Sequence, residues 1–289
     1  MEYLLLILSL FLAVGKNVCS KAGGESLKGV SSLINLNILT GSLALIVYAL
    51  FGVSFELLSD PYYILLGILY ATFASAATML NITAMQYGHV AFCSLVFCAG
   101  FIITTLYCAI FFHEPITLLS GFGMILLIVS IVAVVYRKPN ATQKTSYKFL
   151  FFSIPAMICS GSLGIVQKIF VRKYGESEIN SYLFISFALI LLIAILLRLF
   201  NNPRDITRFK SSNFLVPAVI YSAVYVAINK LNLYLAGVID GVVLFPFMNG
   251  GVIAVTAIAS YFIFKEKLNL RQWIGTVFCI ISILLVAIG

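Results

Sequence analysis

Charged residues are scarce in this chain. Asp, Glu, Lys and Arg together make up 10% of its 289 residues, whereas soluble domains contain roughly 25% of them. Histidine occurs twice and tryptophan once. Predicted loops such as "RKPNATQKTS" at 137–146 are only about ten residues long. This composition excludes an ordinary soluble domain.

The motifs of common enzymes are also missing. The sequence contains no HExxH zinc motif, no GxSxG nucleophile elbow and no Walker loop. It therefore predicts no enzyme, no cofactor, no metal site and no built-in ATP hydrolysis. The cysteines form no CxxC pair and lie within apolar runs, as expected of small packing residues: Cys19, Cys93, Cys98, Cys108, Cys159 and Cys279.

Apolar residues dominate what is present. They make up 62% of the chain, and the mean hydropathy is +1.10. They form runs of about 20 residues, the length that crosses ~30 Å of hydrocarbon, and continuous runs of this kind span membranes as helices. The sequence predicts an all-α integral membrane protein with ten transmembrane helices, at 3–22, 33–52, 62–82, 90–112, 117–136, 148–171, 180–200, 213–235, 242–264 and 270–288. The first run starts with the acidic "ME" and is interrupted by Lys16 and Asn17, so it is predicted as a retained helix rather than a signal peptide.

The two halves of the chain resemble each other. "FHEPITLLSGFG" at 112–123 and "FKEKLNLRQWIG" at 264–275 have the same outline, with Glu114 and Glu266 offset by 152 residues. We therefore expect one five-helix unit at 1–138, a connecting loop at 139–147 and a second unit at 148–289. Because five is odd, the first unit ends on the opposite side of the membrane from where it began, and the second unit therefore has the inverted orientation. This is a 5+5 inverted-topology repeat, an architecture that many transporters use.

The chain resembles the drug/metabolite transporter superfamily with two EamA-type repeats. The resemblance is carried by "FFHEPITLLSGFGMILLIVSIVAVVYR" at 111–137, "LFPFMNGGVIAVTAIASYFIFKE" at 244–266 and "YFIFKEKLNLRQWIGTVFCIISILLVAIG" at 261–289. It implies a secondary transporter that moves amino acids or similar metabolites across the cytoplasmic membrane by alternating access. It also implies that the first, third, fourth, sixth, eighth and ninth helices line the solute cavity. The first repeat departs from the family pattern, since "FCSLVFCAGF" at 92–101 has no proline.

Polar side chains recur in register within the predicted helices. At about 100° per residue, Tyr221, Tyr225, Asn229 and Asn232 share one face of a helix. The equivalent face in the first half carries Tyr70, Ala74, Thr78 and Asn81. Such residues either join helices by hydrogen bonds or line a cavity, and both interpretations stay open for each of them.

Three lysines within the predicted spans point to the chemistry of the solute. Lys16, Lys168 and Lys230 each lie about five or six residues from a helix end, where they either snorkel to the interface or bind an anion. No predicted span carries an acid at its middle to pair with them, which favours an anionic or zwitterionic solute and argues against a proton-driven exporter of organic cations. The predicted solute-contacting residues are Lys16, Asn17, Asn81, Lys168, Tyr225, Asn229, Asn232, Phe247 and Asn249.

The net charge of +8 comes from basic residues in the predicted loops, so it indicates membrane orientation rather than binding of nucleic acid. Basic residues follow the odd-numbered helices, which places both termini outside, whereas the family resemblance places them inside. The expected partners are a small-molecule solute and membrane lipid, and the sequence also allows a homodimer. Two other functions stay open: a lipid or lipid-linked carrier translocase, and a membrane scaffold or sensor that transports nothing.

Overall fold

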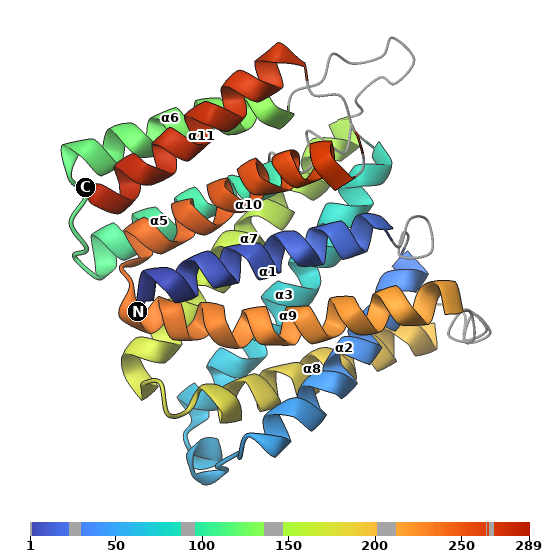
Figure 1. Cartoon of the computed structure of the whole chain (residues 1–289). Helices are drawn as coiled ribbons and strands as arrows, with labels where there is room; N and C mark the ends of the chain where they lie inside the picture. The colour runs from blue at the N-terminus through green and yellow to red at the C-terminus, as the bar shows by residue number, and fades with distance from the viewer. Residues whose placement is uncertain are drawn as a thin grey trace. The chain divides into compact units, whose positions relative to one another are not determined.

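The computed structural model describes residues 2–22, 30–87, 96–135, 147–200, 212–263, 265 and 269–289. Within these ranges the regular structure is entirely helical (Figure 1). The elements are α1 (Glu2–Ala22), α2 (Val30–Leu50), the short 3₁₀ helix η2 (Glu56–Ser59), α3 (Pro61–Tyr87), α5 (Gly100–Phe111), α6 (Leu118–Val135), α7 (Tyr147–Tyr174), α8 (Ile179–Phe200), α9 (Ser212–Val238), α10 (Gly241–Ile263) and α11 (Leu270–Ile288).

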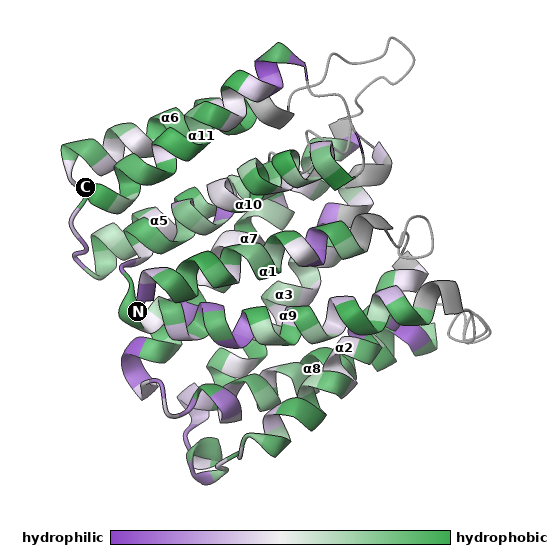
Figure 2. Cartoon of the chain, viewed as in Figure 1, coloured by the Kyte–Doolittle hydropathy of each residue, from purple (hydrophilic) through white to green (hydrophobic). Residues whose placement is uncertain are grey.

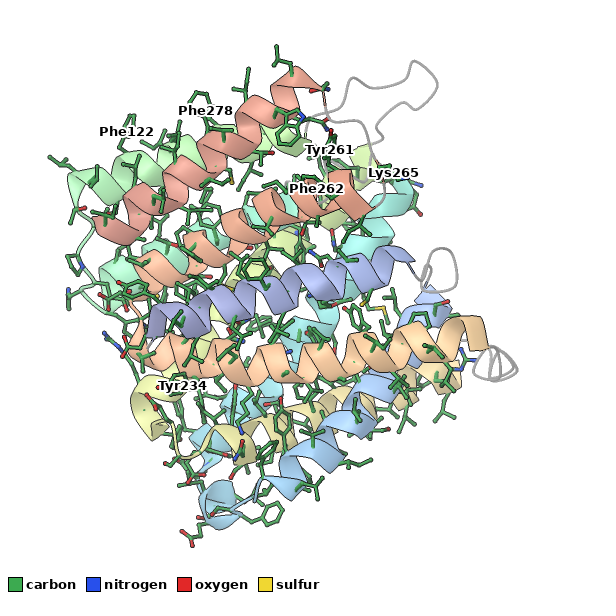
Figure 3. The ribbon with its side chains drawn as sticks, in the orientation of Figure 1. Phe122, Tyr234, Tyr261, Phe262, Lys265 and Phe278 are labelled. Carbon is green, nitrogen blue, oxygen red and sulfur yellow. The ribbon has the colours of Figure 1, made fainter. Side chains whose placement is uncertain are left out.

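Eight helices in the described part of the chain are long and apolar enough to cross a membrane. Two further apolar stretches, Val96–Phe111 and Leu118–Ala133, are shorter as described. Hydrophobic residues run along all the helices, and hydrophilic residues gather near their ends (Figure 2). Many large apolar side chains face outward, including Phe122, which is 61% exposed, and Phe278, which is 44% exposed (Figure 3). The protein is therefore a multi-pass integral membrane protein.

The chain divides into two compact units that interleave along the sequence. The first unit comprises Met1–Val14, Ala76–Ile165 and Val238–Gly289. The second unit comprises Gly15–Ser75 and Val166–Gly237. Each unit therefore takes helices from both halves of the sequence.

In the first unit, α6 packs along α11, and the two helices run antiparallel (Figure 1). A Cβ on Gly123 would lie 2.9 Å from Val286, and a Cβ on Gly289 would lie 2.7 Å from Thr117. The start of α6 therefore meets the end of α11. The start of α11 is fixed by a capping box, in which Asn269 and Gln272 exchange side-chain to backbone hydrogen bonds of 2.9 and 3.1 Å.

Helix α10 packs against α5, again antiparallel. The Glu114 carboxylate, just after α5, accepts a hydrogen bond of 3.1 Å from the backbone N–H of Val242 at the start of α10. The start of α5 meets the middle of α10 in a hydrophobic core, whose buried members are Phe101, Leu127, Ile131, Ala254, Cys279 and Ile283.

Helix α5 also crosses α7 at close range. A Cβ on Gly161 would lie only 2.6 Å from the Gly100 carbonyl oxygen and 2.8 Å from Cβ of Ile103. The Thr104 hydroxyl donates a hydrogen bond of 2.7 Å to the Gly161 carbonyl. Small residues of this kind let two membrane helices bring their backbones together.

In the second unit, α2 and α8 pack antiparallel. Arg198, near the end of α8, donates to the Ser31 hydroxyl at the start of α2 across 3.4 Å. At the opposite end, Asn180 donates to the Phe51 carbonyl, also across 3.4 Å. Between these points, a Cβ on Gly41 would lie 2.9 Å from Cβ of Leu191, so the absence of a side chain permits the contact.

A hydrogen-bonded carboxylate joins the end of α7 to the start of α3. The Tyr174 hydroxyl donates a hydrogen bond of 2.5 Å to Asp60, which also accepts from the Tyr62 N–H across 2.9 Å. The Tyr174 hydroxyl and this N–H hold the pKa of Asp60 below its ordinary value. The contact therefore stabilises the folded protein at pH values above the pKa that Asp60 has in the unfolded chain. This stabilisation is lost as the pH falls through the lower pKa that Asp60 has in the folded protein.

Candidate functional site

The predicted site residue Lys16 lies in the second unit against two aromatic rings of α9. Its ammonium is 5.2 Å from the ring centroid of Tyr225 and 6.0 Å from that of Tyr221. The two rings are stacked with their centroids 5.9 Å apart. This is the geometry of a cation–π contact, which is worth roughly 0.5–2 kcal/mol depending on desolvation. The helical face predicted for Tyr221 and Tyr225 is confirmed by this arrangement.

Asn229, one helical turn after Tyr225, joins α9 to α3. The Tyr70 hydroxyl donates a hydrogen bond of 2.5 Å to its Oδ1, and its Nδ2 donates to the Tyr225 carbonyl across 2.8 Å. Tyr70 is 1% exposed and Asn229 is 6% exposed. Both ends of the amide therefore hold protein partners, and in this state Asn229 positions the two tyrosines.

Further hydrogen bonds hold α9 against α2. The Tyr48 hydroxyl donates to the Val226 carbonyl across 2.8 Å, and the hydroxyls of Thr40 and Ser222 are 2.8 Å apart. Tyr48 and Ser222 are fully buried. These contacts fix the helix that carries Tyr221, Tyr225 and Asn229, so that the aromatic face opposite Lys16 is held in place.

Tyr70 also belongs to a cluster of aromatic rings. Its ring meets Tyr182 of α8 edge-on at 5.7 Å, and Tyr182 stacks on Phe170 of α7 at 3.7 Å. The Tyr182 hydroxyl donates to the Leu66 carbonyl across 3.0 Å. The roles of Tyr182 and Phe170 could not be predicted from the sequence, because an aromatic residue within an apolar run gives no sign of its partner.

The remaining predicted residues of the second unit have different surroundings. Lys168 is only 3% exposed. Asn17 and Asn232 are half-buried, and Lys168, Asn17 and Asn232 all have interaction partners. Lys230 places its ammonium 4.0 Å from the ring centroid of Phe51, near the end of α2. The second unit therefore contains six of the nine predicted residues, and direct contacts join Lys16 to Tyr225 and Tyr225 to Asn229.

Asn81, Phe247 and Asn249 belong to the first unit. The Asn81 Oδ1 is buried and has no hydrogen-bond partner among the described residues. Asn249 donates to the Phe245 carbonyl within its own helix across 2.9 Å, and Phe247 packs against the core around Phe101. Their contact with solute stays a prediction.

The repeated glutamate motif has a structural role at a helix end. His113, the residue before Glu114, has a left-handed backbone with φ of 54°, a conformation that residues other than glycine rarely adopt. This turn places the buried Glu114 carboxylate at the start of α10, where the helix dipole favours a negative charge. Glu114 therefore lies at a helix end, whereas Glu266 lies outside the described residues.

Replacing Tyr70 with Phe is expected to lower the stability of the second unit by about 1–3 kcal/mol, because the Asn229 Oδ1 loses its donor in a buried place. Thermal unfolding of the purified variant in detergent measures this loss. The matched control is Tyr234→Phe on the same helix as Asn229, where the tyrosine is half-buried. Equal stability of Tyr70→Phe and the parent protein would contradict the proposed positioning role.

Comparison with known proteins finds a family match for the second half of the chain. Residues 148–288 match the EamA-like transporter family. The second half of the chain is therefore similar to this family. EamA-like proteins are membrane transporters of the drug/metabolite class rather than enzymes, which agrees with the resemblance found in the sequence.

The fold of this EamA-like chain also recurs among solved structures. One, described as "Crystal structure of protein", superposes with a TM-score of 0.78 over 99% of this chain and 96% of the other. The two sequences are 11% identical, so the likeness shows the fold alone. No curated protein matches the sequence of the EamA-like chain.

Proposed function

We propose that this EamA-like protein is a secondary active transporter that moves an amino acid, or another small anionic or zwitterionic metabolite, across the cytoplasmic membrane by alternating access. In this proposal, ten helices form a 5+5 inverted repeat. Lys16, supported by Tyr221 and Tyr225, binds the anionic group of the solute.

The antiparallel packing of equivalent helices carries the proposal. Counted within each half, α2 and α8 are the second helices, α5 and α10 the fourth, and α6 and α11 the fifth. Each of these six helices packs against its counterpart from the other half, and each of the three pairs runs antiparallel. Two copies that face opposite ways across the membrane produce this pairing, and an inverted repeat provides two states of similar energy, open to opposite sides.

The backbone supports the same repeat. The non-glycine residues with positive φ, among those described, are His113 at 54° and Lys265 at 52°. They are 152 residues apart, and each immediately precedes the repeated glutamate. Because a left-handed non-glycine residue costs about 1–2 kcal/mol, its recurrence at equivalent positions favours two copies of one folded unit.

The substrate class follows from the charge balance around Lys16. The described acids of the second unit are Glu56, Asp60, Glu176 and Glu178, and all four lie in segments that join its apolar helices. The aromatic rings hold the ammonium without neutralising it, since a ring carries no net charge. An ammonium offers three hydrogen-bond donors, so a solute carboxylate or phosphate is a suitable counter-ion.

The test is a thermal-shift screen of the detergent-purified protein against metabolites, followed by uptake of each stabilising compound into proteoliposomes. We expect hits among carboxylate- or phosphate-bearing solutes, and we expect an internal load of the same solute to accelerate uptake. Uptake that requires a lipid-linked compound would instead identify a lipid translocase. Binding without uptake would favour a sensor and would contradict the proposed transport.

A further inference from the structure

The guanidinium of Arg198 is buried in the second unit. The residue lies near the end of α8 and is 7% exposed. Its Nη1 donates to the Ser31 hydroxyl across 3.4 Å. Its Nε and Nη2 are buried and have no hydrogen-bond partner among the described residues. A charged group is thus enclosed with most of its donors unused by the described residues.

The unused donors form one edge of the guanidinium. Nε–H and Nη2–H point in parallel, and this edge binds the two oxygens of a carboxylate or phosphate at once. The bond to Ser31 uses the other terminal nitrogen and leaves this edge unoccupied by the described residues. Arg198 is therefore oriented for an anion that approaches its free edge.

A second unpartnered group lies on the neighbouring helix. Asn35 is fully buried, and neither its Oδ1 nor its Nδ2 has a partner among the described residues. It follows Ser31 by four residues in α2, so both side chains lie on the same face. Asn35 and Ser31 lie in the first turns of α2, where the helix dipole adds a partial positive charge.

Such an arrangement is unfavourable without a ligand. A buried amide without hydrogen bonds is destabilising, and an unpaired buried charge is more so. The Asn35 amide on α2 and the Arg198 guanidinium on α8 are two such groups, and both lie close to Ser31. A phosphate would accept hydrogen bonds from Nε–H, Nη2–H and the Asn35 amide, and it would neutralise the guanidinium.

The neighbouring surface suggests where such a phosphate comes from. Leu199 and Phe200, the last residues of α8, are 64% and 87% exposed, and Leu196 one turn earlier is 46% exposed. These apolar side chains at the end of a membrane-spanning helix suit the acyl region just below a lipid headgroup.

We propose that Arg198, Ser31 and Asn35 form a phosphate-binding site, which takes either the headgroup of an anionic phospholipid or free phosphate. This site shares no residue with the proposed solute contacts around Lys16. A ligand that binds only the folded protein raises its unfolding temperature, so occupancy is directly measurable.

The experiment uses the full-length protein, delipidated in detergent. Phosphatidylglycerol is added in one arm, and inorganic phosphate, against chloride at equal ionic strength, in the other. At least one probe is expected to raise the unfolding temperature and to bind Arg198→Gln about tenfold more weakly or worse, because a charge-assisted bidentate contact is lost. Arg172→Gln, at an exposed position on α7, is the matched control and should retain the full response.

Asn35→Leu is a second variant that tests the site even if Arg198→Gln fails to fold. It removes a buried amide without partners, so without either probe it should unfold at the parent temperature or above. With a probe, its gain should be smaller than that of the parent. A response to phosphatidylglycerol alone assigns the site to lipid, and a response to both probes assigns it to the phosphate group itself.

Three results would overturn the proposal. One is equal stabilisation of the parent protein and Arg198→Gln. Another is no stabilisation by either probe. The third is a lower unfolding temperature of Asn35→Leu without a probe, because the amide would then have a partner within the protein. None of these results bears on metabolite uptake, so the proposed transport is tested separately.

Discussion

Replacing Lys16 with Met is expected to abolish uptake of the anionic solute while the protein still folds and reaches the membrane. The ammonium lies over the rings of Tyr221 and Tyr225 and is the group that we assign to the solute anion. Removing one partner of a desolvated, hydrogen-bonded charge pair costs about 2–5 kcal/mol. We therefore expect kcat/KM to fall about 100-fold or more in proteoliposome uptake.

Lys230→Met is the matched control for this prediction. Lys230 is also a lysine within an apolar helix, but its ammonium contacts the Phe51 ring near the end of α2. Its replacement should change kcat/KM by less than about threefold, since a snorkelling lysine contributes little beyond its local packing. Lys16→Arg keeps the charge and should retain measurable binding. Unchanged uptake by Lys16→Met would remove Lys16 from the site.

Gly161→Ala is expected to destabilise the first unit by about 3 kcal/mol, near the upper end of the usual range for overpacking. The new Cβ would lie 2.6 Å from the Gly100 carbonyl oxygen and 2.8 Å from Cβ of Ile103. A backbone oxygen cannot move aside as a flexible side chain can. Helices α5 and α7 must therefore separate, and the hydrogen bond from Thr104 to the Gly161 carbonyl lengthens or breaks. Thermal unfolding in detergent measures the loss.

Gly121→Ala in α6 is the control for this crossing. The nearest atom to its added Cβ is Cγ2 of Ile116 at 3.7 Å, an ordinary van der Waals contact. The same substitution should therefore be neutral there, or should stabilise the helix by up to about 1 kcal/mol through its higher helix propensity. Equal unfolding temperatures for the two alanine variants would show that the α5–α7 crossing is looser than described.

The candidate site was partly predictable. Lys16, Tyr225 and Asn229 could be found because a lysine or a period of polar residues within an apolar run departs from its background. Their contacts could not be found, since Tyr70 lies 159 residues from Asn229 and no local pattern relates them. Arg198 and Asn35 were overlooked for the same reason. A basic residue at the end of a membrane helix usually reflects the orientation of the protein in the membrane. Arg198 differs from such residues only because it is buried without full hydrogen bonding among the described residues.

The amino-acid sequence by itself determined that the chain crosses the membrane as helices, because hydrocarbon admits only backbones whose hydrogen bonds are satisfied within the segment. It also determined where the repeated motif occurs, because both copies use similar residues. Tertiary structure alone decided which helices meet, that the pairs α2–α8, α5–α10 and α6–α11 pack antiparallel, and which polar atoms have a partner among the described residues. Those outcomes depend on shape complementarity between distant segments, such as Gly161 against Gly100, and a single apolar run carries no record of the surface that it will contact.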